Sequence, residues 1–193
     1  MKKIALFVLM LAAGFFLNPG FAVAEDYLID TKNSHAFIQF KIPHLGYSWL
    51  LGRFNRFDGT FTYDEKVPAA SSVKVSIDTA SIDSNNAERD KHLRSDDFLD
   101  AGKYPKATFV STSFEPTGEM TATMKGNLTM HGVTRPVKIE VTQVGAGKDP
   151  WGGFRRGFEG TTRLALADYN INFNLGPASK EVELYLSVEG IRQ

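Results

Sequence analysis

The chain has 193 residues, the size of one domain or of a small pair of domains. Its 22 basic and 22 acidic side chains cancel, which argues against the strongly basic surface of a nucleic-acid-binding protein. It contains no cysteine, which excludes disulfides, thiolate metal sites and a cysteine nucleophile.

The first 24 residues have the three-part pattern of a secretory signal peptide. Lys2 and Lys3 form a basic start, residues 4–17 are apolar, and Ala22-Val23-Ala24 supplies the small residues that a signal peptidase recognises. The apolar run is shorter than the ~20 residues that span a bilayer, which favours cleavage after Ala24 over a membrane anchor. We therefore expect a bacterial periplasmic protein with a signal peptide over 1–24 and one domain over 25–193.

Alternation of apolar and polar residues predicts strands in the first half of this domain. Residues 35–42 and 73–77 alternate clearly, and residues 60–64 do so more weakly. Residues 45–57 contain many large apolar side chains without a strand register. We expect them to form an apolar loop that covers an apolar surface or ligand.

Residues 85–104 interrupt the strand pattern. Asn85 followed by Glu88 fits a helix N-terminus, and Lys103-Tyr104-Pro105 fits a helix stop. We expect one or two short helices over about 86–100. Strand patterns return at 107–114, 120–130, 137–141, 158–166 and 182–188, separated by turn-forming residues.

About eight mostly antiparallel strands predict an all-β fold, either a barrel or a sandwich. An eight-stranded barrel has an interior wide enough for side chains or for one small ligand. Small residues such as Ala36, Ala122, Gly126 and Gly160 share the apolar registers. They would either match the taper of a filled barrel or leave a cavity, and the residues alone leave both alternatives open.

Candidate chemical groups are sparse. The four histidines, His35, His44, His92 and His131, show no metal-ligand spacing, and no motif for a nucleophile or for phosphate binding occurs. We therefore expect no catalytic residue, no metal and no cofactor. Residues 89–94 gather four cationic or titratable side chains that could contact a ligand head group, although a solvated helix face is the other interpretation.

Several segments together resemble the YceI family of secreted bacterial proteins. The resemblance lies in residues 44–50, 57–61, 88–95, 126–137 and 149–153, and it extends over 26–191. It implies a single antiparallel eight-stranded lipocalin-like barrel that binds polyisoprenoid chains, such as quinone-like lipids, or other long amphiphiles. It also implies that family members form dimers.

The apolar registers, taken with this resemblance, predict two sets of ligand-binding residues. The predicted lumen residues are Ile38, Phe40, Ile42, Val75, Ile77, Met124, Leu128, Leu164, Leu166, Leu184 and Leu186. The predicted mouth residues, which would cover an end or contact a head group, are His44, Leu45, Trp49, Phe54, Arg89, His92 and Arg94.

The resulting hypothesis is a periplasmic carrier that holds a polyisoprenoid or another long-chain amphiphile in its barrel. One alternative is an enzyme that acts on a lipid or quinone head group with His44, His92 and Asp96. Another is a ligand-free, stress-related interaction protein with a filled barrel. No nucleic-acid partner is expected, whereas a homodimer and a transient membrane contact stay open.

Overall fold

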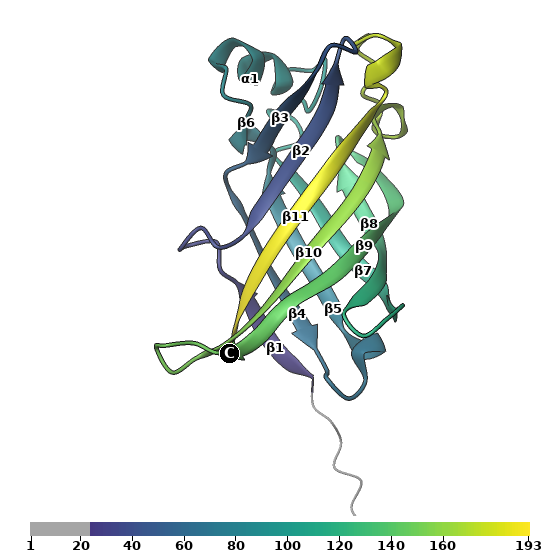
Figure 1. Ribbon diagram of the computed structural model, residues 1–193. Helices are drawn as coiled ribbons and strands as arrows, with labels where there is room; N and C mark the ends of the chain where they lie inside the picture. The colour runs from purple at the N-terminus through teal and green to yellow at the C-terminus, as the bar shows by residue number, and fades with distance from the viewer. Residues whose placement is uncertain (1–23) are drawn as a thin grey trace, which may run out of the picture.

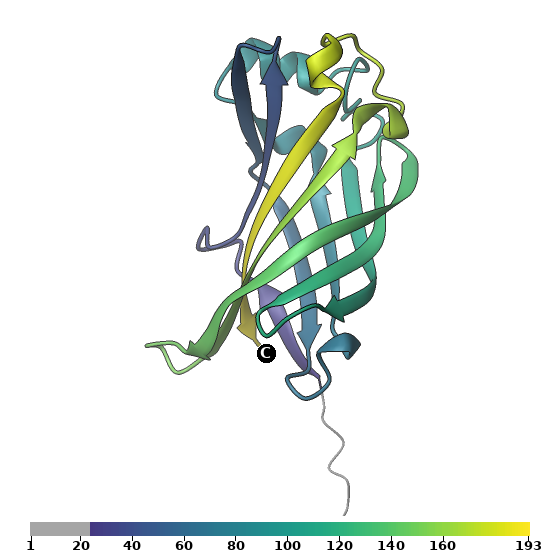
Figure 2. The same ribbon diagram turned by 45° about the vertical axis from the view of Figure 1, so that its right-hand side comes forward.

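The computed structural model describes residues 24–193, so the signal peptide predicted over 1–24 lies, except for Ala24, outside the described residues (Figure 1). Within this part of the chain, no helix has the length and apolar character needed to cross a bilayer. The described residues form an elongated β structure with a single α-helix near one end (Figures 1 and 2).

Eleven strands carry the fold, and all their pairings are antiparallel. They are β1 (Glu25–Ile29), β2 (Phe37–His44), β3 (Ser48–Phe54), β4 (Phe57–Tyr63), β5 (Ser72–Asp78), β6 (Ile82–Asp83), β7 (Lys106–Pro116), β8 (Thr121–Met130), β9 (Val133–Lys148), β10 (Phe154–Ala165) and β11 (Glu181–Arg192).

Eight of these strands close into a barrel. The hydrogen-bonded order β1-β4-β5-β7-β8-β9-β10-β11 returns to β1, because β11 also pairs with β1. The predicted antiparallel eight-stranded barrel is therefore confirmed. Alternating residues point inward and form its core, as the period-two pattern requires.

The extended chain is interrupted between β1 and β2, and both strands pair with β11 in turn. The part of the barrel beside β2, toward α1, is called the upper half. β11 pairs with β1 from Arg192 to Gly190 and with β2 from Ser187 to Glu183. β3 then pairs with β2, and β6 pairs with the last two residues of β3. The β2–β3 hairpin consequently rises beside β11 to the end of the molecule that carries the helix (Figures 1 and 2).

The expectation of an apolar loop over residues 45–57 was wrong, because Ser48–Phe54 forms strand β3. Leu50 and Phe54 are packed against the core, whereas Trp49 and Leu51 are exposed on the opposite face. Apolar residues on both faces hide the alternation that identifies a half-buried strand.

Helix α1 (Ala87–Leu93) is the predicted helical insertion, and it is shorter than expected. The Asn86 side chain accepts a hydrogen bond of 2.9 Å from the Arg89 backbone N–H, as an N-cap does. The buried Asp90 carboxylate accepts a 2.8 Å bond from the Ser84 backbone N–H. This bond ties the helix to the chain that leaves β6, so α1 is held beside one end of the barrel.

The opposite end of the barrel, which carries β1, is filled by aromatic side chains. The rings of Tyr27 and Phe61 stack at 4.7 Å, and Phe158 packs edge-on against Phe61. Arg156 is almost fully buried there, with its guanidinium carbon 4.1 Å from the Tyr63 ring centre and an ion pair to Glu65. We call this the far end, and its packing leaves the other end as the route into the barrel.

Candidate ligand-binding site

The upper half of the barrel encloses an apolar cavity of about 510 Å³. Its walls come from β2, β3, β5, β6, β7, β8, β11, the segment from α1 to Leu99, and residues 164–179. Exposed residues among the lining, such as His44, His92 and Asn174, show that the cavity reaches the surface at the end that carries α1. We call this opening the mouth.

Eight of the predicted lumen residues line this cavity. They are Ile38, Phe40, Ile42, Ile77, Leu128, Leu164, Leu166 and Leu184. Met124 and Leu186 instead line a second apolar cavity of about 80 Å³ nearer the far end. Val75 lines neither of these cavities and packs against the core cluster around Tyr27 and Phe61.

Phe109 lies between the two cavities along β7, although it is not among the side chains that line either of them. Along β7, Ala107 lines the larger cavity and Phe114 the smaller one, and Phe109 lies between them. On β8, Gly126 occupies the equivalent position between Leu128 and Met124. A Cβ at position 126 would lie 2.3 Å from Phe109 Cζ, so Gly126 leaves no void but makes room for this ring. The predicted lumen is thus present but divided.

The predicted mouth residues fall into two groups. His44, Leu45, Phe54, Arg89 and His92 line the cavity. Trp49 and Arg94 do not, which corrects their predicted positions.

Trp49 lies on the outer face of β3, with Lys41 Nζ 4.7 Å from its ring centre. Arg94 points toward β6, where Nη1 donates to the Ile82 carbonyl at 3.4 Å. The loop interpretation of residues 45–57 gave Trp49 no strand register, and the predicted helix did not fix the direction in which Arg94 points.

Residues 166–176 also line the mouth, and only Leu166 among them was a predicted site residue. Ile171, Phe173 and Leu175 all line the cavity, and they alternate with asparagines. This short period-two pattern could have identified them. Leu93, Phe98 and Leu99, which line the cavity from the helical insertion, were likewise not among the predicted site residues.

Aromatic contacts join the helical insertion to residues 166–176 across the mouth. The His92 ring lies 4.9 Å from Phe98 and 4.9 Å from Phe173, edge-on to each. His92 Nε2 lies 2.7 Å from Asp97 Oδ2. The partner of His92 is thus Asp97 and not the Asp96 of the enzyme alternative.

Polar groups in the lining gather at the mouth. They are His44 on the hairpin, Arg89 and His92 on α1, and Asn174 and Ser179 on the segment before β11. Arg89 Nε donates to Ser84 Oγ at 2.7 Å, and Nη2 donates to the Ser84 carbonyl. These bonds hold the guanidinium at the edge of the cavity, with its remaining N–H groups free of protein acceptors within residues 24–193.

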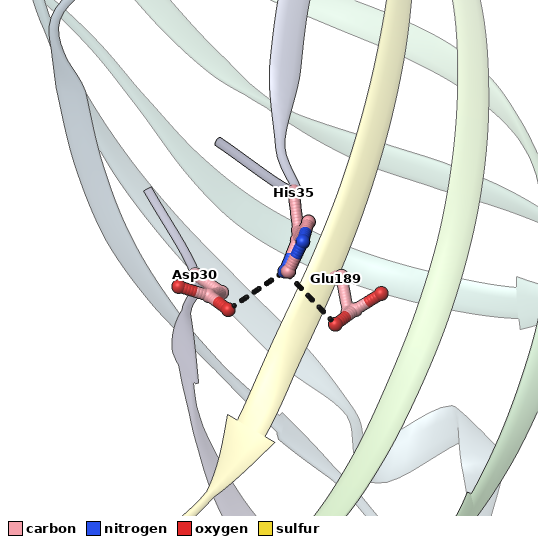
Figure 3. Close-up of side chains that lie close together, drawn as sticks. All are labelled: Asp30, His35 and Glu189. Carbon is pink, nitrogen blue, oxygen red and sulfur yellow. Dashed lines mark hydrogen bonds and ion pairs between the residues drawn. The ribbon is translucent and has the colours of Figure 1, made fainter. Parts of the chain in front are cut away.

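A separate charged cluster lies where β11 exchanges β1 for β2 (Figure 3). His35 Nδ1 is 3.1 Å from Asp30 Oδ2 and 3.6 Å from Glu189 Oε1. Ligand atoms of these three residues lie within 4.8 Å of one another, a spacing that a metal ion could use. Arg155 Nη1, however, is 2.8 Å from Asp30 Oδ2 and also contacts Glu189, so an internal cation already pairs with both carboxylates.

This cluster closes the seam of the barrel. Burial alone would raise the pKa of Asp30, but hydrogen bonds from Arg155, Asn33 and His35 outweigh it and hold that pKa well below its usual range. Asp30 is therefore ionised in the fold and ties the β1–β2 corner to β10. The cluster is not part of the cavity, because none of these residues belongs to its lining.

Comparison with protein families matches the YceI-like domain over residues 27–190. The chain belongs to the YceI family. It is 58% identical to a UPF0312 protein of Pseudomonas paraeruginosa over the full length of both chains. It is 56% identical to Protein YceI of Escherichia coli, over 94% of each chain.

Solved structures share the YceI-family barrel. BcnA of Burkholderia cenocepacia superposes with a TM-score of 0.73 at 23% identity, over 83% of this chain and 98% of that one. A polyisoprenoid-binding domain from Saccharophagus degradans superposes with a TM-score of 0.65 at 17% identity, over 86% and 98% of the two chains. At these identities the likeness establishes the fold alone.

Proposed function

We propose that this YceI-family protein is a periplasmic carrier that holds a polyisoprenoid or similar long-chain amphiphile, with its hydrocarbon chain in the cavity of the upper barrel. The observation that carries the proposal is an apolar cavity of about 510 Å³ whose polar lining groups gather at its mouth. Such a site matches a ligand with a polar head and a long apolar chain. The binding named for the Saccharophagus degradans domain supports the same ligand class.

Burial of the chain supplies the driving force. Each buried methylene contributes about 0.8 kcal/mol, so ~20 carbons contribute about 16 kcal/mol before the costs of association and ordering. The remainder suffices for tight binding without a strong polar contact. The signal-peptide pattern predicted over residues 1–24 supports the periplasm as the location.

The mouth would hold the head group. Arg89 presents a fixed guanidinium at the cavity edge, and His44, His92, Asn174 and Ser179 add hydrogen-bonding groups of both kinds. A phosphate, a hydroxyl or a quinone carbonyl can accept from such donors. The proposal therefore assigns the chain to the cavity and the head to α1 and its neighbours.

The direct experiment is native mass spectrometry of protein purified from the periplasm, followed by organic extraction and identification of the lipid. We expect an isoprenoid or a comparable long-chain amphiphile in a defined ratio to protein. Repeatedly empty protein that also fails to take up a prenyl alcohol or a quinone after delipidation would refute the proposal.

A pair of variants locates the site. Leu128 lines the cavity on β8, whereas its neighbour Asn127 is exposed on the outer face. Leu128→Arg places a charge in an apolar space and should abolish uptake of the prenyl alcohol, while Asn127→Arg should bind like the parent. Circular dichroism and thermal unfolding establish that both variants fold. Undiminished uptake by folded Leu128→Arg would refute the assignment of the chain to this cavity.

A further inference from the structure

The outer face of the β2–β3 hairpin exposes four large apolar side chains. Leu45, Tyr47, Trp49 and Leu51 are 60%, 88%, 59% and 64% exposed, and we call them the mouth patch. No acidic residue, lysine or arginine occurs from Ile42 to Gly52. An exposed aromatic and aliphatic group of this kind marks an interaction site rather than ordinary surface.

The mouth patch adjoins the entrance to the cavity. Leu45 belongs both to the patch and to the cavity lining, and Phe173, 43% exposed, lies on the same rim. The hairpin tip stands at the end of the barrel that carries α1 and the segment before β11 (Figures 1 and 2). Whatever covers the patch therefore also faces the mouth.

The chemistry of the patch fits a phospholipid bilayer. Tryptophan and tyrosine favour the headgroup level of a membrane, where the ring is apolar and its N–H or O–H stays wet. Lys41 and Arg53 flank the patch, but each is already paired within the protein, Lys41 Nζ with Glu183 at 3.0 Å and Arg53 Nη2 with Asp83 at 3.8 Å. The match to a bilayer therefore rests on the exposed aromatic and apolar side chains.

A second copy of the chain fits the patch less well. A standard protein interface buries about 800 Å² per partner. Two aromatic residues of ~150–250 Å² each and two partly covered leucines fall short of that area.

We propose that the mouth patch docks the protein on a phospholipid membrane and places the mouth against the bilayer interface. The inference rests on the proposed carrier function and adds the surface from which the ligand is taken. A hydrocarbon chain can then pass between bilayer and cavity without crossing water, which would be costly for every exposed methylene.

Two tryptophans make the test direct, since the described chain carries Trp49 in the patch and Trp151 on the β9–β10 hairpin near the far end (Figure 1). Vesicles of phosphatidylethanolamine and phosphatidylglycerol, without isoprenoid, are added to Trp151→Phe and to Trp49→Phe. We expect a blue shift, and quenching by brominated acyl chains, in Trp151→Phe, which reports on Trp49. The Trp49→Phe variant should show neither.

Binding of the same vesicles is then measured by co-sedimentation. The double variant Tyr47→Ser/Leu51→Ser should bind at least about tenfold more weakly, because two apolar contacts are lost. The matched control Val144→Ser/Trp151→Ser removes two side chains that are 67% and 76% exposed away from the mouth, and should bind like the parent.

Three results would overturn the proposal: quenching of Trp151 but not of Trp49, no vesicle binding by the parent, or equal losses in the two double variants. Analytical ultracentrifugation distinguishes a further case. If the patch variants convert a dimer to a monomer without changing vesicle binding, the patch is a contact between copies and the membrane inference fails. Because the vesicles hold no isoprenoid, all these results are independent of the lipid identification that tests the carrier function.

Discussion

Replacing Phe109 tests whether a single ring sets the length of chain that the barrel accepts. The ring is buried over Gly126 and lies between the cavity of about 510 Å³ and that of about 80 Å³. Phe109→Ala removes this division and should join the two spaces. The apolar chain could then run past β8 toward Met124 and the far end.

The cost in stability follows from the burial of the ring. Phe109 is only 7% exposed, and a buried Phe→Ala substitution typically costs about 3–5 kcal/mol, part of which comes from the void that remains. A ligand that fills the void recovers some of this loss, because binding to the folded state stabilises it. Thermal unfolding with and without ligand therefore measures both effects.

The assay is uptake of a series of prenyl alcohols of increasing length, followed by native mass spectrometry. We expect Phe109→Ala to shift the preferred length upward and to gain more stability from long chains than the parent does. Phe114→Ala is the matched control, because Phe114 lines the smaller cavity without separating the two. An unchanged length preference in folded Phe109→Ala, or the same shift in Phe114→Ala, would contradict the reasoning.

Two further predictions concern charged groups. The folded-state pKa of Asp30 lies below the ordinary ~3.9, so its ionised form stabilises the fold above about pH 4, and this contribution is lost as the pH falls through the folded pKa. Asp30→Asn should lower the free energy of unfolding by about 1.5–3 kcal/mol at pH 7 through its lost bonds to Arg155, and the difference from the parent should shrink in acid. Urea unfolding at pH 7 and at acidic pH measures this difference. The exposed Asp58→Asn should show no such trend. Arg89→Gln should weaken binding of a prenyl phosphate about 10–100-fold and leave binding of the prenyl alcohol nearly unchanged. The control Lys91→Gln, on the exposed side of α1, should alter the binding of neither ligand. Equal losses for both ligands in Arg89→Gln would remove Arg89 from the head-group site.

Strand periodicity was sufficient for the all-β class and for most of the inner wall, whereas the choice of a barrel over a sandwich came from the family resemblance. Residues such as Ile38, Leu128 and Leu184 face inward because side chains alternate along a strand, and this alternation is local information. The helical insertion was likewise recognisable from the Asn85–Glu88 pattern and the loss of period two, although its cap is Asn86 and its helix ends at Leu93. Local patterns predict such elements better than their ends.

The pattern failed where a strand carries apolar residues on both faces. Trp49 and Leu51 point outward beside the inward Leu50, so β3 looked like a loop and Trp49 was placed at the cavity. The outward residues do not pack in the core, and the proposed membrane contact gives them a different apolar surrounding. A sequence shows which residues are apolar but not which surface each of them meets.

Composition and periodicity already specified a disulfide-free all-β domain with an apolar interior, because both depend only on residue types and on their spacing along the chain. The division of that interior by Phe109, the closed far end and the meeting of Arg89, His92 and Phe173 at one mouth depend on side chains far apart in the sequence. Their distances are set only when β11 pairs with both β1 and β2 and the barrel closes. Whether an apolar interior is filled or hollow is decided by that packing, since a ring such as Phe109 can occupy the space that a glycine on the next strand leaves.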